Sequence, residues 1–423
     1  MKSNLQKHIG AKELLAYYIS SVVGVGVLII PGIAAQIAGP ASLLSWVFLA
    51  LISAPFAIAF AQMAILVPNS GGVPSFVEQK FDPILGQAMA ILLSLSMVIG
   101  NPVLGLASAH YLRDLLGFEE LWVPWVGFGF MLFSIAFNLI GIRVGSKIQS
   151  YALFFLILGL IAIVLLSLPK TELKNMTPFF PHGVTSVGSA MVVCLFSFLG
   201  WENVSSIAEE VKQPERTFRK VIPWAIACVG GLYISIAWVY LAVVPEVLRQ
   251  NDPTVISPIL RVVFGGPVAT IGGLIALVLL VLTTNSWVLG ASRQIYALAR
   301  NRVLPSALGQ VSGRTGAPAP ALLFLALGYG LITFLISSTG WSEQWLIQLA
   351  NANFLLIYLG AFFAALRVFP SRKMRACAWL AILATASFVP FFGWMMLGSV
   401  GLLAVPYGWF FYRSRTGIQK IPA

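Results

Sequence analysis

Two long apolar stretches of the chain are interrupted near their centres. The first reads Ser20-Ser21-Val22-Val23-Gly24-Val25-Gly26-Val27, and the second reads Phe196-Ser197-Phe198-Leu199-Gly200-Trp201-Glu202. The paired glycines weaken a helix where it would be most deeply buried. The carboxylate costs at least about 2.5 kcal/mol at the centre of a bilayer. Because broken backbone is tolerated in hydrocarbon only beside a protein-lined cavity, the pattern predicts two transmembrane helices that open around a polar site.

Each interruption also has a structural interpretation. Glycines let helices approach closely, although Gly24 and Gly26 are nearer in sequence than the four-residue spacing usual for such contacts. Glu202 could cap unwound backbone amides, or it could bind and release a proton as water enters and leaves the cavity. Both interpretations of Glu202 stay open at this point.

The composition places nearly the whole chain in a membrane. Of 423 residues, 59% are hydrophobic and 9% are charged, against about 25% charged residues in a soluble domain. A helix needs about 20 mostly apolar residues to cross a bilayer. The sequence predicts an all-α polytopic membrane protein with twelve such helices. Their expected ranges are 13–37, 41–66, 84–110, 122–142, 147–168, 185–208, 218–244, 265–292, 318–338, 345–366, 376–393 and 395–412.

The net charge of +12 follows the topology and does not indicate nucleic acid. An even number of spans puts both termini on one side of the membrane. If that side is the cytoplasm, most of the 26 basic residues lie inside, as the positive-inside rule requires. The exceptions are Arg113, Lys170, Lys174, Arg249 and Arg261. We therefore expect cytoplasmic termini, loops that face anionic lipid, and no nucleic-acid partner.

The titratable residues do not show the spacing of a catalytic or metal-binding motif. Cysteines and histidines are few and widely separated: Cys194, Cys228, Cys377, His8, His110 and His182. We expect no metal, no cofactor and no catalytic residue, because no ligand spacing or phosphate loop occurs. An intramembrane enzyme remains a remote alternative, and a channel lacks a visible ring of pore-lining charges or carbonyls.

The two interrupted helices occupy corresponding places if the chain contains a repeat. Spans one to five, in 13–168, and spans six to ten, in 185–366, would be two copies of one unit. An odd number of spans inverts the second copy, and paired breaks in such halves indicate a substrate site at the midplane. Residues 1–423 then form a single transport domain, with 376–412 as two accessory helices.

Several separated motifs resemble the amino acid–polyamine–organocation (APC) superfamily over nearly the whole chain. They are Gly24-Val25-Gly26-Val27 through Pro31-Gly32, Pro68-Asn69-Ser70-Gly71-Gly72-Val73, Asn138 to Gly141 with Gln149, the second break with Glu209-Glu210-Val211-Lys212-Gln213-Pro214-Glu215-Arg216, and Asn285 with Ser292-Arg293 and Leu298-Ala299-Arg300 to Leu304-Pro305. The resemblance implies the leucine-transporter fold and secondary active transport by alternating access. Within the superfamily, the chain looks most like bacterial exporters of methionine and branched-chain amino acids, which implies a location in the bacterial inner membrane.

An amino acid substrate needs partners for its carboxylate and its ammonium in a cavity of low polarity. The amides of the half-helix after the first break suit the carboxylate, and we expect Gly24, Val25 and Gly26 to bind it. The ammonium would take carbonyls near Ser21, Val22, Phe196, Ser197 and Leu199. The expected walls are Phe198, Trp201, Ile99, Val103 and Asn285. Because Glu202 is the one carboxylate deep in a span, a neutral, apolar substrate is favoured over arginine, lysine or a polyamine.

Coupling and direction are less constrained. Many APC members carry a lysine in the middle of helix 5 where this chain has Leu156, so a lysine-based mechanism is in doubt. Glu202 is then the candidate proton-coupling residue. Sodium could bind hydroxyls of Thr283, Thr284 and Ser286, but such hydroxyls usually bond their own helix. Export, proton-coupled transport and exchange stay open, as does import or exchange of another small amino acid or amine.

Overall fold

A computed structural model describes residues 9–23, 26–67, 72–140, 146–204, 211–250 and 252–416. Those residues are almost entirely helical, and their one β-type pairing is an isolated bridge between Ile9 and Val211. Parts of the quoted motifs lie outside the described residues, namely 24–25, 68–71, 141–145 and 205–210.

The first five predicted spans are confirmed as helices, two of them divided. The helices are α1 (Ala11–Val22), α2 (Gly26–Ala38), α3 (Ser42–Leu66), α5 (Pro83–Gly100), α6 (Pro102–Leu116), α7 (Val123–Leu139) and α8 (Ser146–Ser167). The short helix α4 (Gly72–Lys80) joins α3 to α5. The break at Asn101, between α5 and α6, is one that the sequence analysis did not predict. Its signal is Pro102, which has no amide hydrogen to donate within a helix.

The remaining seven predicted spans are helical too. They are α9 (Thr185–Cys194) with the 3₁₀ turn η5 (Leu195–Phe198), α10 (Pro214–Val243), α13 (Gly266–Arg300), α14 (Ala319–Thr339), α15 (Glu343–Val368), α16 (Arg372–Phe392) and α17 (Trp394–Arg415). Two short helices, α11 (Glu246–Arg249) and α12 (Ile256–Phe264), lie between α10 and α13. Ten helical segments of the described residues are long and apolar enough to cross a membrane, and one of them, Gly26–Leu66, contains both α2 and α3.

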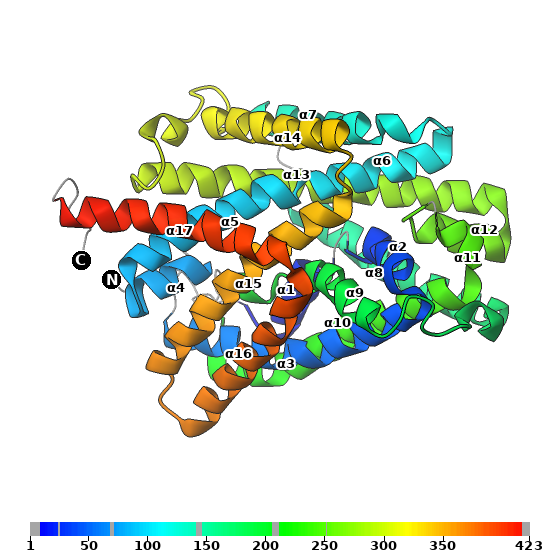
Figure 1. Cartoon of the computed structure of the whole chain (residues 1–423), viewed down its shortest axis with the longest axis horizontal. Helices are drawn as coiled ribbons and strands as arrows, with labels where there is room; N and C mark the ends of the chain where they lie inside the picture. The colour runs from blue at the N-terminus through cyan, green and yellow to red at the C-terminus, as the bar shows by residue number, and fades with distance from the viewer. Residues whose placement is uncertain are drawn as a thin grey trace.

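The helices run roughly side by side, and the broken ones lie in the interior (Figure 1). α6, α7, α13 and α14 pack on one another at one side of the bundle, while α3 packs on α9 and α10 at the other. α2 packs on α9, so the two interrupted spans meet. Apolar side chains such as Leu51, Leu274 and Leu327 are exposed on the outer helix faces. Such faces suit lipid rather than water.

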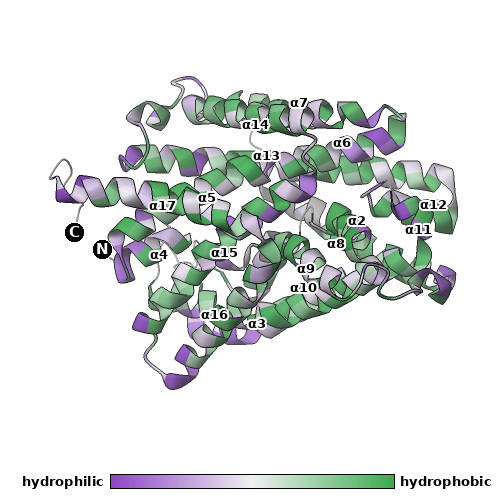
Figure 2. Cartoon of the chain, viewed as in Figure 1, coloured by the Kyte–Doolittle hydropathy of each residue, from purple (hydrophilic) through white to green (hydrophobic). Residues whose placement is uncertain are grey.

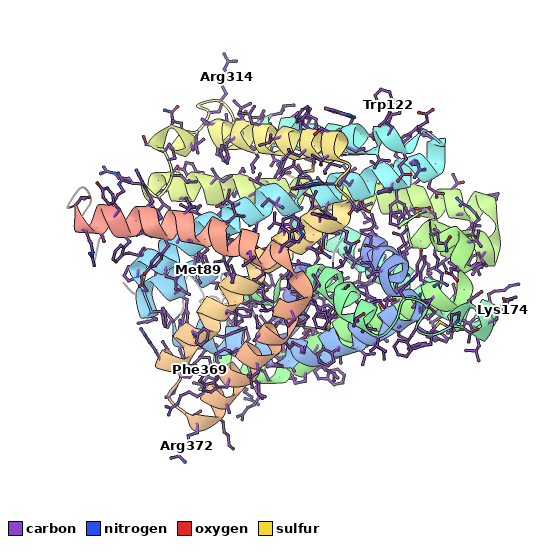
Figure 3. All side chains as sticks on the ribbon, viewed as in Figure 1. Met89, Trp122, Lys174, Arg314, Phe369 and Arg372 are labelled. Carbon is purple, nitrogen blue, oxygen red and sulfur yellow. The ribbon has the colours of Figure 1, made fainter. Side chains whose placement is uncertain are left out.

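Polar residues gather at the two ends of the bundle, and apolar residues fill the length between them (Figure 2). α17, the last described helix, ends at the left-hand end of the bundle (Figure 1). Arg314 and Arg372 lie toward that end, and Lys174 lies at the opposite end (Figure 3). The molecule therefore has the form of a multi-pass membrane protein.

Candidate functional site

The first span breaks where the glycines predict. α1 ends at Val22, and Val23 is extended with φ −78° and ψ 100°. α2 begins at Gly26, so the amides of its first turn have no helical partner. A Cβ atom at Gly26 would lie 2.3 Å from Ser197 Oγ and 2.9 Å from Ser197 Cα. Gly26 is thus required by the close approach of the two broken helices.

The second break has a different geometry. α9 passes into the 3₁₀ turn η5, Leu199 is extended, and Gly200 has φ +119°. A Cβ atom at Gly200 would lie 2.4 Å from the carbonyl oxygen of Ser21. Only glycine adopts this conformation without strain, and its missing side chain lets the second break pack on the end of α1.

Glu202 ties the second break to a neighbouring helix. Its Oε2 accepts a hydrogen bond from the amide of Gly200, at 2.9 Å, and another from the hydroxyl of Tyr358 on α15. The carboxylate therefore caps unwound backbone, as the structural interpretation predicts. The same contacts place the Glu202 carboxylate between the second break and α15, so they are compatible with a coupling role as well.

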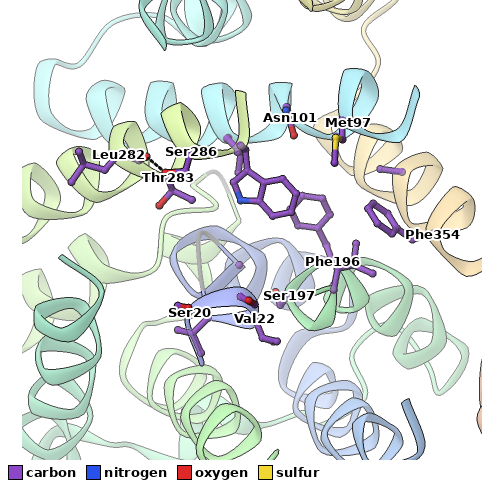
Figure 4. Close-up of a pocket in the computed structure, with 18 of the residues that line it drawn as sticks. Ser20, Val22, Met97, Asn101, Phe196, Ser197, Leu282, Thr283, Ser286 and Phe354 are labelled. Carbon is purple, nitrogen blue, oxygen red and sulfur yellow. Dashed lines mark hydrogen bonds between the residues drawn. The ribbon is translucent and has the colours of Figure 1, made fainter. Parts of the chain in front are cut away.

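A cavity of about 450 Å³ lies against both breaks (Figure 4). Its lining comes from the two broken spans, from α5 and α6, and from α8, α13 and α15. The lining residues are Tyr17, Ser20, Ser21, Val22, Val23, Gly26, Ser96, Met97, Gly100, Asn101, Leu104, Leu156, Phe196, Ser197, Leu199, Leu279, Leu282, Thr283, Ser286, Trp287, Ala350 and Phe354. None of these residues carries a formal charge. The cavity is of the size and mixed polarity usual for a small-molecule site.

Six of the residues proposed from the sequence meet at this cavity. They are Ser21, Val22, Gly26, Phe196, Ser197 and Leu199, while Gly24 and Val25 lie outside the described residues. Ser197 is 2% exposed, and its Oγ has no hydrogen-bond partner among the described residues. The carbonyl of Val22 already accepts a hydrogen bond from Tyr233 at 2.9 Å. Ser197 is thus a buried lining hydroxyl with hydrogen-bonding capacity left to offer a ligand.

Phe198 and Trp201 lie outside the lining. Phe198 packs on Trp46 and Tyr233, with ring centroids 6.1 and 5.2 Å away, and Trp201 packs on Tyr18 at 5.6 Å. Phe196 and Leu199 line the cavity, whereas Phe198 and Trp201 pack into the buried core beside it. Phe198 is the last residue of η5, and Trp201 follows Gly200 and the extended Leu199, so the irregular backbone of the break sets where the two rings lie.

Ile99, Val103 and Asn285 are also absent from the lining. On the third span, Ser96, Met97, Gly100, Asn101 and Leu104 take the expected place of Ile99 and Val103. Asn285 Oδ1 instead accepts a hydrogen bond from Asn138 of α7 at 2.8 Å. The cavity face of α13 is formed by Leu279, Leu282, Thr283 and Ser286, at the three- and four-residue spacing of one helix face.

Several lining residues were not predicted, because the sequence does not show which face of an apolar helix points toward the cavity. Trp287, Phe354 and Met97 add apolar wall, and Asn101 donates a hydrogen bond to Tyr329 at 2.9 Å. Leu156, already singled out as standing in place of a lysine, lines the cavity. The proline after Asn101 was a signal for a third break.

The hydroxyls considered for sodium bond their own helix. Thr283, Thr284 and Ser286 donate to the carbonyls of Leu279, Leu280 and Leu282, at 2.8, 2.8 and 2.9 Å. No cluster of three metal-ligating side chains occurs in the part of the chain that the structure describes.

Broken helices around an uncharged cavity, inside a multi-pass helical bundle, define the chain as a membrane transport protein. Comparison with known sequences gives the family. The amino acid permease family matches residues 9–416, so the chain belongs to that family, which is part of the APC superfamily. It is a permease and not an enzyme.

The relatives are bacterial permeases in several cases. The chain is 27% identical over 423 residues to the uncharacterized amino acid permease YecA of Bacillus subtilis, covering 99% of both chains. It is 24% identical to the branched-chain amino acid permease BcaP of the same organism, covering 80% of this chain and 76% of that one. It is 23% identical to the serine/threonine exchanger SteT, covering 88% and 84%. The chain is therefore similar to transporters of chemically different amino acids.

Proposed function

We propose that this amino acid permease carries neutral, apolar amino acids of the methionine and branched-chain type by alternating access. The observation that carries the proposal is the cavity itself. Its lining joins the start of α2 to the unpaired hydroxyl of Ser197, and it contains no charged residue. Such a site can bind both charges of the backbone of an amino acid and no further charge.

The two charges of the substrate would bind at the breaks. The free amides and positive dipole end of α2, beginning at Gly26, favour the carboxylate. Ser197 Oγ and the carbonyl oxygens at the end of α1 and in η5 would accept from the ammonium. Hydrogen bonds are needed at both ends because burying an unpaired charged group is costly.

The substrate side chain would lie against apolar wall. Phe196 and Phe354 lie together on one side of the cavity, near Met97 and Asn101, while Leu282, Thr283 and Ser286 line another side (Figure 4). A cationic side chain would find no carboxylate there. The similarity to BcaP supports this substrate class, whereas the similarity to SteT favours the alternative of a small polar amino acid.

We further propose that 13–168 and 185–366 are inverted repeats and that the termini face the bacterial cytoplasm. The paired breaks support the repeat. Arg314 and Arg372 lie toward the end of the bundle where α17 ends, which supports the orientation by the positive-inside rule (Figure 3). Glu202 would carry the coupling proton, and gradients would set import, export or exchange.

Binding of the twenty amino acids to the purified protein tests the proposal. A ligand that binds only the folded state raises its apparent stability by mass action, by about 2.7 kcal/mol at 100 times the dissociation constant. We expect methionine, leucine, isoleucine and valine to raise the unfolding temperature. Stabilisation by arginine or lysine in their place would contradict the assigned cavity.

A further inference from the structure

A loop between α11 and α12 packs on α2 and α6, two helices that also contribute Gly26 and Leu104 to the cavity lining. Residues 252–255 form this loop, here called the covering loop. The amide of Val255 donates to the carbonyl of Leu28 at 3.2 Å, and Tyr111 donates to the same carbonyl at 2.9 Å. A Cβ atom at Gly32 would lie 2.0 Å from the carbonyl oxygen of Pro253. The covering loop must therefore move if the cavity is to open between α2 and α6.

A group of titratable side chains lies where the covering loop meets α6 and α15. His110, next to Tyr111 on α6, has Nε2 3.3 Å from Oε2 of Glu343, the first residue of α15. Their side chains are 11% and 16% exposed. Asp252, in the covering loop, lies close enough for its charge to act on His110. One imidazole thus faces two carboxylates from two other elements.

The neighbouring arginines have other partners, although the charge of Arg113 also opposes protonation of His110. Arg261 on α12 pairs with Asp114 at 2.6 Å, and Arg113 pairs with Glu120 at 3.6 Å. Arg249 donates to the carbonyl of Asn175 at 3.2 Å. Among the described residues, His110 is the only basic side chain that forms an ion pair with Glu343. The local charge balance therefore depends on whether His110 is protonated.

We propose that His110, Glu343 and Asp252 form a proton-binding site, separate from the substrate cavity, that holds the covering loop closed when it is protonated. Charged His110 joins α6 to α15 and attracts the covering loop. When His110 loses its proton, Glu343 and Asp252 both lose the positive charge that acts on them, which favours opening. The site regulates the gate that the proposed transport function requires, so it rests on that function.

The covering loop gives the sign of the pH effect independently. Burial raises the pKa of the Asp252 carboxyl, against the hydrogen bonds that it accepts from the amide and hydroxyl of Thr254 at 2.9 and 2.8 Å. In an open state Asp252 would regain water and its ordinary pKa. A group whose pKa is raised in the closed state stabilises that state at low pH, and the stabilisation is lost as pH rises. Both groups therefore predict a gate that opens with rising pH.

Thiol labelling in right-side-out vesicles tests the proposal. Leu104 lines the cavity, so Leu104→Cys, in a protein with Cys194, Cys228 and Cys377 replaced by alanine, reports whether a membrane-impermeant reagent can pass the gate. The pH also changes intrinsic thiol reactivity. Each rate is therefore divided by the rate of Lys174→Cys, whose parent side chain is 76% exposed at the same end, measured at the same pH.

The normalised rate should rise at least about fivefold between about pH 5 and pH 8. His110→Gln and Glu343→Gln should label fast at every pH, and His110→Lys, a permanent cation, should label slowly at every pH. Glu172→Gln removes an exposed carboxylate that pairs with Lys174, and it should keep the parent profile. A flat or falling parent profile, or a parent-like profile in His110→Gln, would overturn the proposal.

Ligand binding separates this proposal from the transport function. None of the substituted gate residues lines the cavity, so methionine or leucine should still raise the unfolding temperature of each gate variant. That result also shows that a variant is folded. If no amino acid stabilises the parent protein, the proposed function fails, while the labelling ratio still decides the proton site.

Discussion

A single added methyl group at Gly26, the first residue of α2, would disturb the contact between the two helix breaks. In Gly26→Ala, the new Cβ would lie 2.3 Å from Ser197 Oγ and 2.9 Å from Ser197 Cα, which belongs to the backbone. Ordinary contact begins near 3.4 Å and Ser197 Cβ would be 2.7 Å away, so even after Oγ rotates aside the two breaks must separate by about 0.7 Å. A rotation of the serine side chain cannot relieve the backbone contact.

The expected cost follows from overpacking. Extra volume in a packed site costs about 1–3 kcal/mol. Because the contact includes backbone of the second break, we expect the upper part of that range. If the strain is relieved only by displacing the substrate site, affinity falls by about tenfold to a hundredfold, since about 1.4 kcal/mol is a factor of ten.

Thermal-shift titration with methionine or leucine measures this loss of affinity directly. Gly231→Ala is the matched control, because a Cβ there meets nothing within 4 Å and the position lies within α10. Both are glycine-to-alanine changes in helical segments, and only the change at Gly26 creates a contact with Ser197. Parent-like affinity in Gly26→Ala would refute the proposed meeting of the two breaks at the substrate.

Three further predictions follow from the same contacts. Glu202→Gln should keep substrate exchange but lose the dependence of net transport on a pH gradient. Weaker hydrogen bonds to Gly200 and Tyr358 should also cost it about 1–2 kcal/mol of stability; unchanged gradient dependence in proteoliposomes would eliminate Glu202 as the coupling group. Gly200→Ala should bind substrate more weakly and unfold at a lower temperature, because φ at this position is +119° and the Ser21 carbonyl leaves no room for a Cβ atom. A parent-like melting curve would count against this. In competition for labelled leucine, methionine, isoleucine and valine should displace it while arginine, lysine and putrescine do not; stronger displacement by the cations would show that a carboxylate reaches the substrate.

The fold was predictable because membrane helices carry their signal in composition. Twelve apolar runs were visible, and each is helical in the structure. The two breaks were predictable from Gly26 and Gly200. At each position only a glycine, which has no Cβ atom, fits against the neighbouring residue, Ser197 or Ser21. Local sequence is sufficient here because the conformation of one residue decides the outcome.

Which residues form the cavity walls depends on how each helix is rotated about its axis, and a run of apolar residues does not specify that rotation. Phe198 and Trp201 were assigned to the wall as aromatic neighbours of the break, yet Phe198, at the end of η5, packs on Trp46, and Trp201, beyond Gly200, packs on Tyr18. Asn285 was assigned to the wall as a polar residue in a span, but its side chain accepts a hydrogen bond from Asn138 of α7 and does not line the cavity. Such partners come from distant segments, so no local pattern reveals them.

Counterflow of labelled methionine or leucine in proteoliposomes tests the central claim, that an amino acid crosses the membrane through the cavity at the two helix breaks. Vesicles preloaded with the unlabelled amino acid should accumulate the label transiently with the parent protein and with Gly231→Ala, and should accumulate far less with Gly26→Ala when the substrate is near the parent's dissociation constant. Equal accumulation by Gly26→Ala and the parent, or no counterflow of any neutral amino acid by the parent, would contradict the account.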